Sequence, residues 1–90
     1  MLLEQVASRL NTLPEQLERE SLRLYLEHKL RVVESELFAL VSRYGVETVF
    51  ALDEAVQSGR FHEPEAFEDY FHFDYLEHER QTLRELLGQV

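Results

Sequence analysis

The chain has no cysteine, only three glycines and only two prolines. Without cysteine it has neither disulfides nor thiolate metal ligands, and three isolated glycines form no phosphate-binding loop. Its longest uncharged stretch, Leu37 to Ser42, is far shorter than the roughly 20 apolar residues of a membrane span. The first residues also lack the basic flank of a signal peptide. We therefore expect a soluble, cytoplasmic protein that does not bind membranes.

Basic residues are scarce in the second half of the chain. Residues 1–45 contain six Lys/Arg and seven Asp/Glu, whereas residues 46–90 contain three and eleven, so the two halves carry net charges of −1 and −8. Nucleic acids are polyanions that proteins bind mainly through Lys and Arg, so the second half would repel them. The acidic half instead suits a basic protein partner, or serves solubility alone.

The residue types that catalysis uses are present, but they show no catalytic arrangement. No serine lies in a nucleophile elbow or a similar context. Acidic residues are so common that pairs of them carry no information about acid–base catalysis. A small helical chain also lacks the volume for a sizeable pocket unless it oligomerises. We therefore expect a non-enzymatic protein without catalytic residues or a cofactor.

The composition, with 44% hydrophobic positions and few helix breakers, predicts a single all-α domain over residues 1–90. Apolar spacing and breakers predict helices over about 2–10, 14–44, 47–57 and 64–87. We expect Thr12 and Glu15 to form a capping box for the second helix, with Pro14 in its first turn. Gly45 should end this helix in the left-handed conformation, and Ser58-Gly59 should end the third.

The helix expected over 14–44 is too long for a compact domain of this size. It would measure about 46 Å, whereas a globule of this length is about 30 Å across. We expect it to pack antiparallel to the C-terminal helix, with the short helix 47–57 at its Tyr44-Gly45 end. Its N-terminal part is then covered by the helix over 2–10 or by a second copy. We favour a homodimer, whose predicted interface is the stripe Leu22, Leu26, Leu30 and Val33.

The first half of the last helix is rich in both aromatic and acidic residues. Its aromatic side chains are spread over more than half of the helical wheel, so they cannot all point in one direction. They are Phe67, Tyr70, Phe71, Phe73 and Tyr75. Two interpretations stay open: the short helix covers the second aromatic face, or part of this face docks a partner.

The same helix suggests a metal site by its spacing of acidic and histidine residues. Asp69 and His72 are three residues apart and Asp74 and His78 are four apart, and these are the spacings of helix-borne metal ligands. Di-iron bundles use Glu-x-x-His pairs, and the chain contains none. We therefore predict no metal site. The alternatives to a partner-binding module are a metal-binding protein with its site at a dimer interface, or a structural homodimer.

The order of several short patterns resembles a known class of proteins. A charged helix runs into Arg43-Tyr44-Gly45, a short helix contains Val49-Phe50, and after Ser58-Gly59 comes a helix with Glu68-Asp69-Tyr70-Phe71. This arrangement, over roughly residues 30–87, resembles small antitoxin-like proteins encoded in bacteria and archaea beside ribonuclease-like toxins. The resemblance implies a non-enzymatic protein that neutralises a basic toxin by burying its aromatic-acidic helix on it.

The resemblance also implies roles for individual residues of this helix. The aromatic anchors of the interface would be Tyr70, Phe71, Phe73 and Tyr75, because binding energy concentrates in a few buried aromatic side chains. The acidic residues Glu68, Asp69 and Asp74 would steer the encounter more than they would hold the complex.

Overall fold

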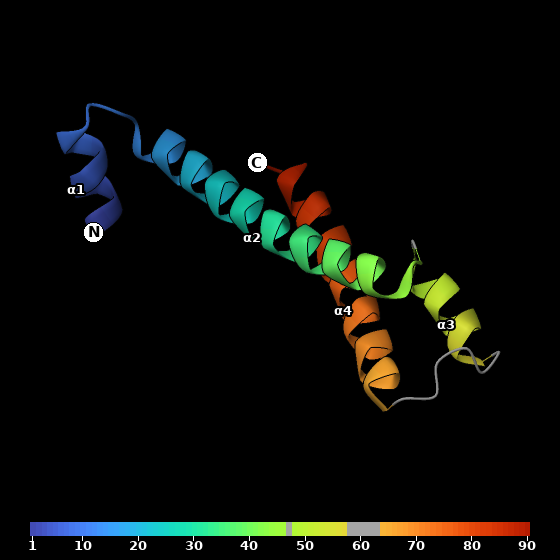
Figure 1. Cartoon of the computed structure of the whole chain (residues 1–90). Helices are drawn as coiled ribbons and strands as arrows, with labels where there is room; N and C mark the ends of the chain where they lie inside the picture. Colours follow the sequence, from blue (N-terminus) through green and yellow to red (C-terminus); the bar gives the residue numbers. More distant parts are fainter. Residues whose placement is uncertain (47, 58–63) are drawn as a thin grey trace.

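The computed structural model of the chain describes residues 1–46, 48–57 and 64–90. Its helices are α1 (Leu2–Arg9), α2 (Pro14–Tyr44), α3 (Val49–Gln57) and α4 (Pro64–Leu87), and they form an elongated molecule (Figure 1). Within the described ranges there is no β-strand, so the all-α class is confirmed. The break predicted at Ser58-Gly59 lies outside the described residues. Across the same ranges, none of the helices combines the length and the apolar run that crossing a membrane requires.

The two ends of α2 have different chemistry. At the start, the predicted capping box of Thr12 and Glu15 is wrong, because Leu13 is the N-cap residue and no side chain caps the helix. Pro14 explains this: a proline restricts the residue before it to extended backbone, and Leu13 has φ −78° and ψ 138°. At the other end the prediction is confirmed. Gly45 has φ 66° and donates its N–H to the Val41 carbonyl at 2.8 Å.

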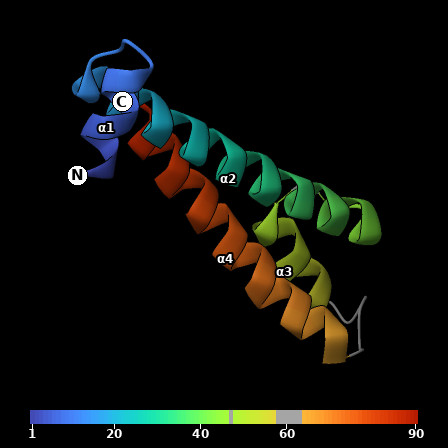
Figure 2. The same cartoon turned by 90° about the vertical axis from the view of Figure 1, so that its left-hand side faces the viewer.

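The core lies between α2 and α4, which run antiparallel side by side (Figure 2). Successive polar pairs show the direction: Arg43 meets Asp69, Glu34 meets Arg84, and Arg23 donates to the carbonyl of Val90. The buried residues between them come from one stripe of each helix and from the segment that follows α2. They are Val33, Leu37, Leu40, Tyr44, Val46, Leu52, Phe73, Leu76 and Leu83.

The short helix α3 packs where α2 ends, as predicted. Leu52, at its centre, is fully buried and belongs to the same core as Tyr44 and Val46. The Thr48 hydroxyl accepts a hydrogen bond from the Ala51 N–H at 3.0 Å, which satisfies one free amide at the start of α3. Its contacts are mainly with α4, so this helix packs on α4 beside the end of α2.

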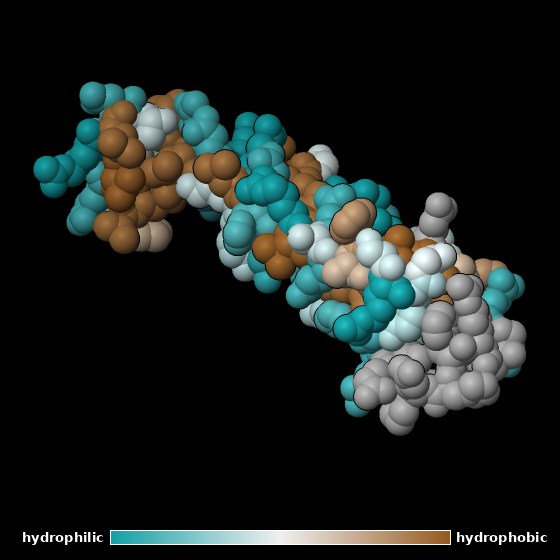
Figure 3. Space-filling view, in the orientation of Figure 1, coloured by the Kyte–Doolittle hydropathy of each residue, from teal (hydrophilic) through white to brown (hydrophobic). Residues whose placement is uncertain are grey.

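The N-terminal end of α2 extends beyond α4, and α1 packs against it. The chain measures 60 × 20 × 19 Å and has a radius of gyration of 18.8 Å, whereas a compact globule of this length has about 12 Å. Ala7 is the buried residue of α1. Apolar residues nevertheless remain gathered at the surface over α1 (Figure 3). The contact between α1 and α2 thus buries only part of the apolar surface at this end of the molecule.

Candidate functional site

The aromatic residues of α4 are divided between its two faces. Phe73 is 1% exposed and lies in the core with Leu76, whereas Phe71 is 66% exposed and Tyr75 is 61% exposed. Phe71 and Tyr75 are four residues apart, so they share the face of α4 that points away from α2. The prediction of Phe73 as a partner anchor is therefore wrong, because its ring already fills the space between the two helices.

Tyr70 lies at the boundary between these two faces. It is half-buried and packs against the core. Its ring meets the Phe71 ring edge-on, with centroids 5.2 Å apart and an angle of 72° between the planes. This is a favourable arrangement for two aromatic rings. Tyr70 therefore supports Phe71 from the side rather than standing free as an anchor itself.

Asp69 is used within the chain. One of its carboxylate oxygens accepts hydrogen bonds from the Arg43 guanidinium at 2.8 Å and from the Tyr44 hydroxyl. Burial raises the pKa of Asp69, but the bonds from Tyr44 and Arg43 and the charges of Arg43 and His72 outweigh it, so the pKa lies below its ordinary value. The prediction of Asp69 as a steering charge is corrected accordingly: it fastens α4 to the end of α2.

The same contacts change the ionisation of the two groups that bind Asp69. Burial, with the hydrogen bond to Asp69 and its charge, raises the pKa of the Tyr44 hydroxyl. The hydrogen bond and charge of Asp69 raise the pKa of the Arg43 guanidinium. At neutral pH the three groups are therefore held as a carboxylate, a neutral phenol and a cation, and this is the combination that the two hydrogen bonds require.

Glu68 and Asp74 remain as exposed acids beside the outward aromatic residues. Between positions 68 and 79, α4 carries five Asp/Glu and no Lys or Arg. The two arginines of α4 form ion pairs further along, Arg80 with Glu77 at 3.7 Å and Arg84 with Glu34 of α2 at 3.9 Å. We call Phe71 and Tyr75 with Glu68 and Asp74 the α4 face. It is apolar in the middle and negative at its sides.

The stripe predicted as a dimer interface belongs mainly to the core of a single chain. Val33 is buried, and Leu26 and Leu30 are partly buried against the same core. Leu22 alone of the four is largely accessible, at 48%. The prediction is wrong for Val33, because α4 already covers the side of α2 on which it lies.

The spaced acids and histidines of α4 do not come together as a metal site. In the described part of the chain, no three His, Asp or Glu side chains gather where a metal ion could be held. Asp69, which pairs with His72 in the predicted spacing, is engaged by Arg43 and Tyr44. The structure thus offers no specific support for the alternative of a metal-binding protein.

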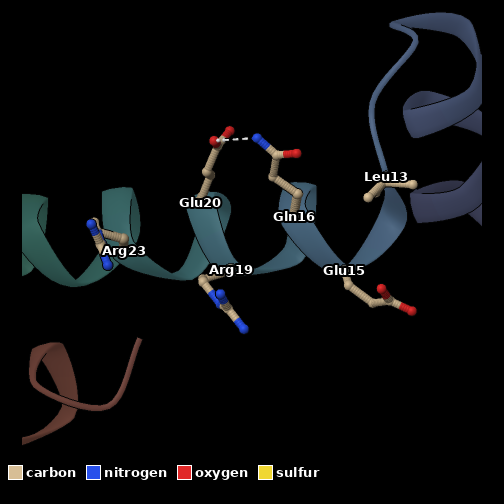
Figure 4. A pocket seen from close by; sticks show the side chains of 6 residues that line it. All are labelled: Leu13, Glu15, Gln16, Arg19, Glu20 and Arg23. Atoms are coloured by element: carbon tan, nitrogen blue, oxygen red, sulfur yellow. Dashed lines mark hydrogen bonds between the residues drawn. The ribbon is translucent and has the colours of Figure 1, made fainter.

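A hollow of about 470 Å³ lies beside the start of α2. It is lined by Leu13, Glu15, Gln16, Arg19, Glu20 and Arg23. Gln16 donates to Glu20 at 3.1 Å on one side of the helix, whereas Glu15 and Arg19 point to the other side (Figure 4). Catalytic groups must converge on one reacting atom, and these polar groups diverge.

Two features of the surface could not be read from the sequence. The bond between Arg43 and Asp69 joins residues 26 positions apart, and no local pattern in the sequence connects them. Leu2, Val6 and Leu10 lie at helical spacing in the sequence, but this spacing does not show that the folded chain leaves them exposed. For the bond between Arg43 and Asp69, the best available signal was the opposite charge of these two residues, one near the end of the predicted helix 14–44 and the other near the start of the predicted helix 64–87.

Comparison with known proteins places the chain in a family. A family model described as "Uncharacterized protein MJ0235 family" matches residues 1–90, so the chain belongs to this family. No curated protein and no solved structure matches it.

Proposed function

We propose that this member of the MJ0235 family is a non-enzymatic protein-interaction module that binds a basic protein through the α4 face. One observation carries the proposal: Phe71 and Tyr75 are large aromatic residues that lie one helical turn apart and largely exposed, with acidic residues around them. Binding energy at protein interfaces concentrates in such aromatic side chains when a partner buries them. An exposed pair at this spacing is typical of a helix that docks into an apolar groove.

The α4 face is held in place before any partner binds. Tyr70 supports the Phe71 ring from the side, and Asp69 fastens the same turn of α4 to Arg43 and Tyr44 of α2. A surface that is already ordered loses less conformational entropy on binding. These internal contacts therefore favour the α4 face as a binding surface.

The charge around the aromatic pair favours a basic partner. Over its whole length α4 carries seven Asp/Glu and two Lys/Arg. Such a surface attracts a positively charged protein at a distance and raises the rate of encounter. It repels nucleic acids for the same reason.

The resemblance to antitoxin-like proteins supports a more specific partner. We propose that the partner is a ribonuclease-like toxin encoded beside this chain, that both act in the cytoplasm, and that the chain neutralises the toxin. A ribonuclease needs a cationic surface to bind RNA. An acidic helix that occupies this surface would exclude the substrate.

The first experiment is co-expression of the chain with the product of the neighbouring gene. We expect a complex whose dissociation constant increases at least tenfold with Phe71→Ala or with Tyr75→Ala, a loss of about 1.4 kcal/mol or more. Phe38→Ala is the matched control, because Phe38 is an aromatic residue 72% exposed on α2. It should leave the affinity unchanged. Equal affinity for all the variants would refute the α4 face as the binding surface.

The ribonuclease activity of the partner tests the neutralising role separately. The wild-type chain should inhibit RNA cleavage at a stoichiometric ratio, and Phe71→Ala should inhibit it only at higher concentration. If a complex forms through Phe71 and Tyr75 but RNA cleavage is unchanged, the proposal of an interaction module stands and the proposal of an antitoxin role is refuted.

A further inference from the structure

Several exposed apolar residues gather at the other end of the molecule from α3 (Figure 3). They are Met1, Leu2, Val6, Leu10 and Leu13, each exposed by more than a third, and we call them the α1 patch. Figure 3 shows this apolar surface over α1. Contiguous apolar patches of this kind on a small domain indicate an interaction site.

The α1 patch is ordered by its own hydrogen bonds. Leu2, Val6 and Leu10 are four residues apart along α1, while the fully buried Ala7 is turned toward α2. In the segment between α1 and α2, the Thr12 N–H donates a hydrogen bond to the Ala7 carbonyl at 2.9 Å. α1 therefore packs on its own chain through Ala7, while Leu2, Val6 and Leu10 beside it stay exposed.

The distribution of charge indicates that a second copy can bind here. Residues 1–31 contain five Lys/Arg and five Asp/Glu, whereas α4 has a net charge of −5. A two-fold axis places the same surface of both chains face to face. Two electrically neutral ends can meet in this way without repulsion, but two copies of α4 cannot.

The accessible area agrees with an unfilled interface. The chain has an accessible surface of 6811 Å², whereas a folded monomer of its mass has roughly 5,500 Å². The excess of about 1,300 Å² exceeds the roughly 800 Å² that each partner contributes to an interface of standard size. One isologous contact at the overhanging end would remove most of this excess.

We propose that two copies of the chain form a two-fold dimer through their α1 patches, with the N-terminal ends of both α2 helices packed beside them. In this dimer, α1 and the N-terminal end of α2 from each copy pack around the leucines of the two α1 patches. The contact replaces the predicted stripe, of which only Leu22 lies near the overhanging end. Both α4 faces stay accessible at the outer ends, so the dimer presents two copies of the α4 face to basic partners.

The test is the mass of the full chain in solution, measured by sedimentation equilibrium. Wild type should have about twice the chain mass of 10.7 kDa at concentrations on the order of 100 μM, where a dimer with a dissociation constant below about 10 μM is largely assembled. Leu10→Glu should give a monomer with unchanged helicity, because Leu10 is 66% exposed in the single chain. Phe38→Glu is the matched control and should remain dimeric.

A monomeric wild type would overturn the proposal. A dimer that Phe38→Glu dissociates and Leu10→Glu does not would overturn it as well, since the interface would then lie on the middle of α2. These outcomes are independent of the α4 face, because none of the variants changes it.

The absence of cysteine provides a second measurement that does not depend on weakening the dimer. Leu10→Cys introduces a single thiol near the expected two-fold axis, and mild oxidation should join two chains by a disulfide. Phe38→Cys should give much less covalent dimer under the same conditions. Equal cross-linking of the two variants would indicate random collision and contradict the proposed contact.

Discussion

Asp69 of α4 accepts a hydrogen bond from Arg43 of α2 at 2.8 Å, next to the point where Gly45 ends the long helix. The Tyr44 hydroxyl donates to the same carboxylate oxygen. Together these groups join the last turn of α2 to the beginning of α4. They fix the orientation of the turn of α4 that also carries Phe71, so the stability of the α2–α4 pair and the geometry of the α4 face depend on one carboxylate.

Removing this carboxylate should destabilise the fold. We expect Asp69→Ala to lower the free energy of unfolding by about 1–2 kcal/mol, because the Tyr44 hydroxyl, whose residue is buried, loses this hydrogen bond. The exposed guanidinium of Arg43 adds little, since water screens its charge. Asp74→Ala is the control on the same helix and should change stability by less than about 0.5 kcal/mol. Urea unfolding measures both, and equal effects would contradict the role assigned to Asp69.

The lowered pKa of Asp69 predicts a dependence of stability on pH. A carboxyl whose pKa is lower in the folded chain stabilises the fold fully above its unfolded pKa, which is 3.8. This contribution is lost as the pH falls below that value and through the folded pKa. The difference in unfolding free energy between wild type and Asp69→Asn should therefore be smaller at about pH 3 than at about pH 6. An unchanged difference would show that the hydrogen bonds do not favour the charged form.

Much of the fold could be predicted from the sequence because its helices have clear local boundaries. Gly45 ends α2 because it can take a positive φ, and Pro14 and Pro64 each begin a helix. The capping box at Thr12 failed because two local signals compete there. Pro14 holds Leu13 extended, and this moves the start of the helix one residue beyond the position where Thr12 could cap it.

The candidate site could be predicted only in part. The sequence shows that the aromatic residues of α4 occupy two faces, but not which face α2 covers. That choice depends on packing between helices: Phe73 is buried in the same core as Leu37 and Leu40, whereas Phe71 is exposed. Asp69 and Asp74 are both aspartates on the same helix, and the sequence does not distinguish their roles. In the structure, Asp69 accepts hydrogen bonds from Arg43 and Tyr44.

Single substitutions should separate the core aromatic residue from the exposed ones. Phe73→Ala removes a fully buried ring and should cost about 3–5 kcal/mol, a large fraction of the stability of a small domain. Phe71→Ala and Tyr75→Ala should each cost less than about 1 kcal/mol, because most of their surface is already in contact with water. Thermal unfolding followed by circular dichroism would measure the three variants. A cost for Phe71→Ala as large as that for Phe73→Ala would place Phe71 in a buried environment in solution.

The end of α2 gives a last prediction that concerns the backbone alone. A Cβ atom added at Gly45 would meet no heavy atom within 4 Å beyond those of Gly45 and its two chain neighbours, yet the residue has φ 66°. Gly45→Ala should therefore destabilise the chain by about 1–2 kcal/mol through backbone strain and not through a clash. Gly45→Asn should cost less, because asparagine tolerates the left-handed conformation better than alanine. If the two variants were equally stable, the strain explanation would fail, and the end of α2 would have to be fixed by the contacts of Tyr44 with Asp69 instead.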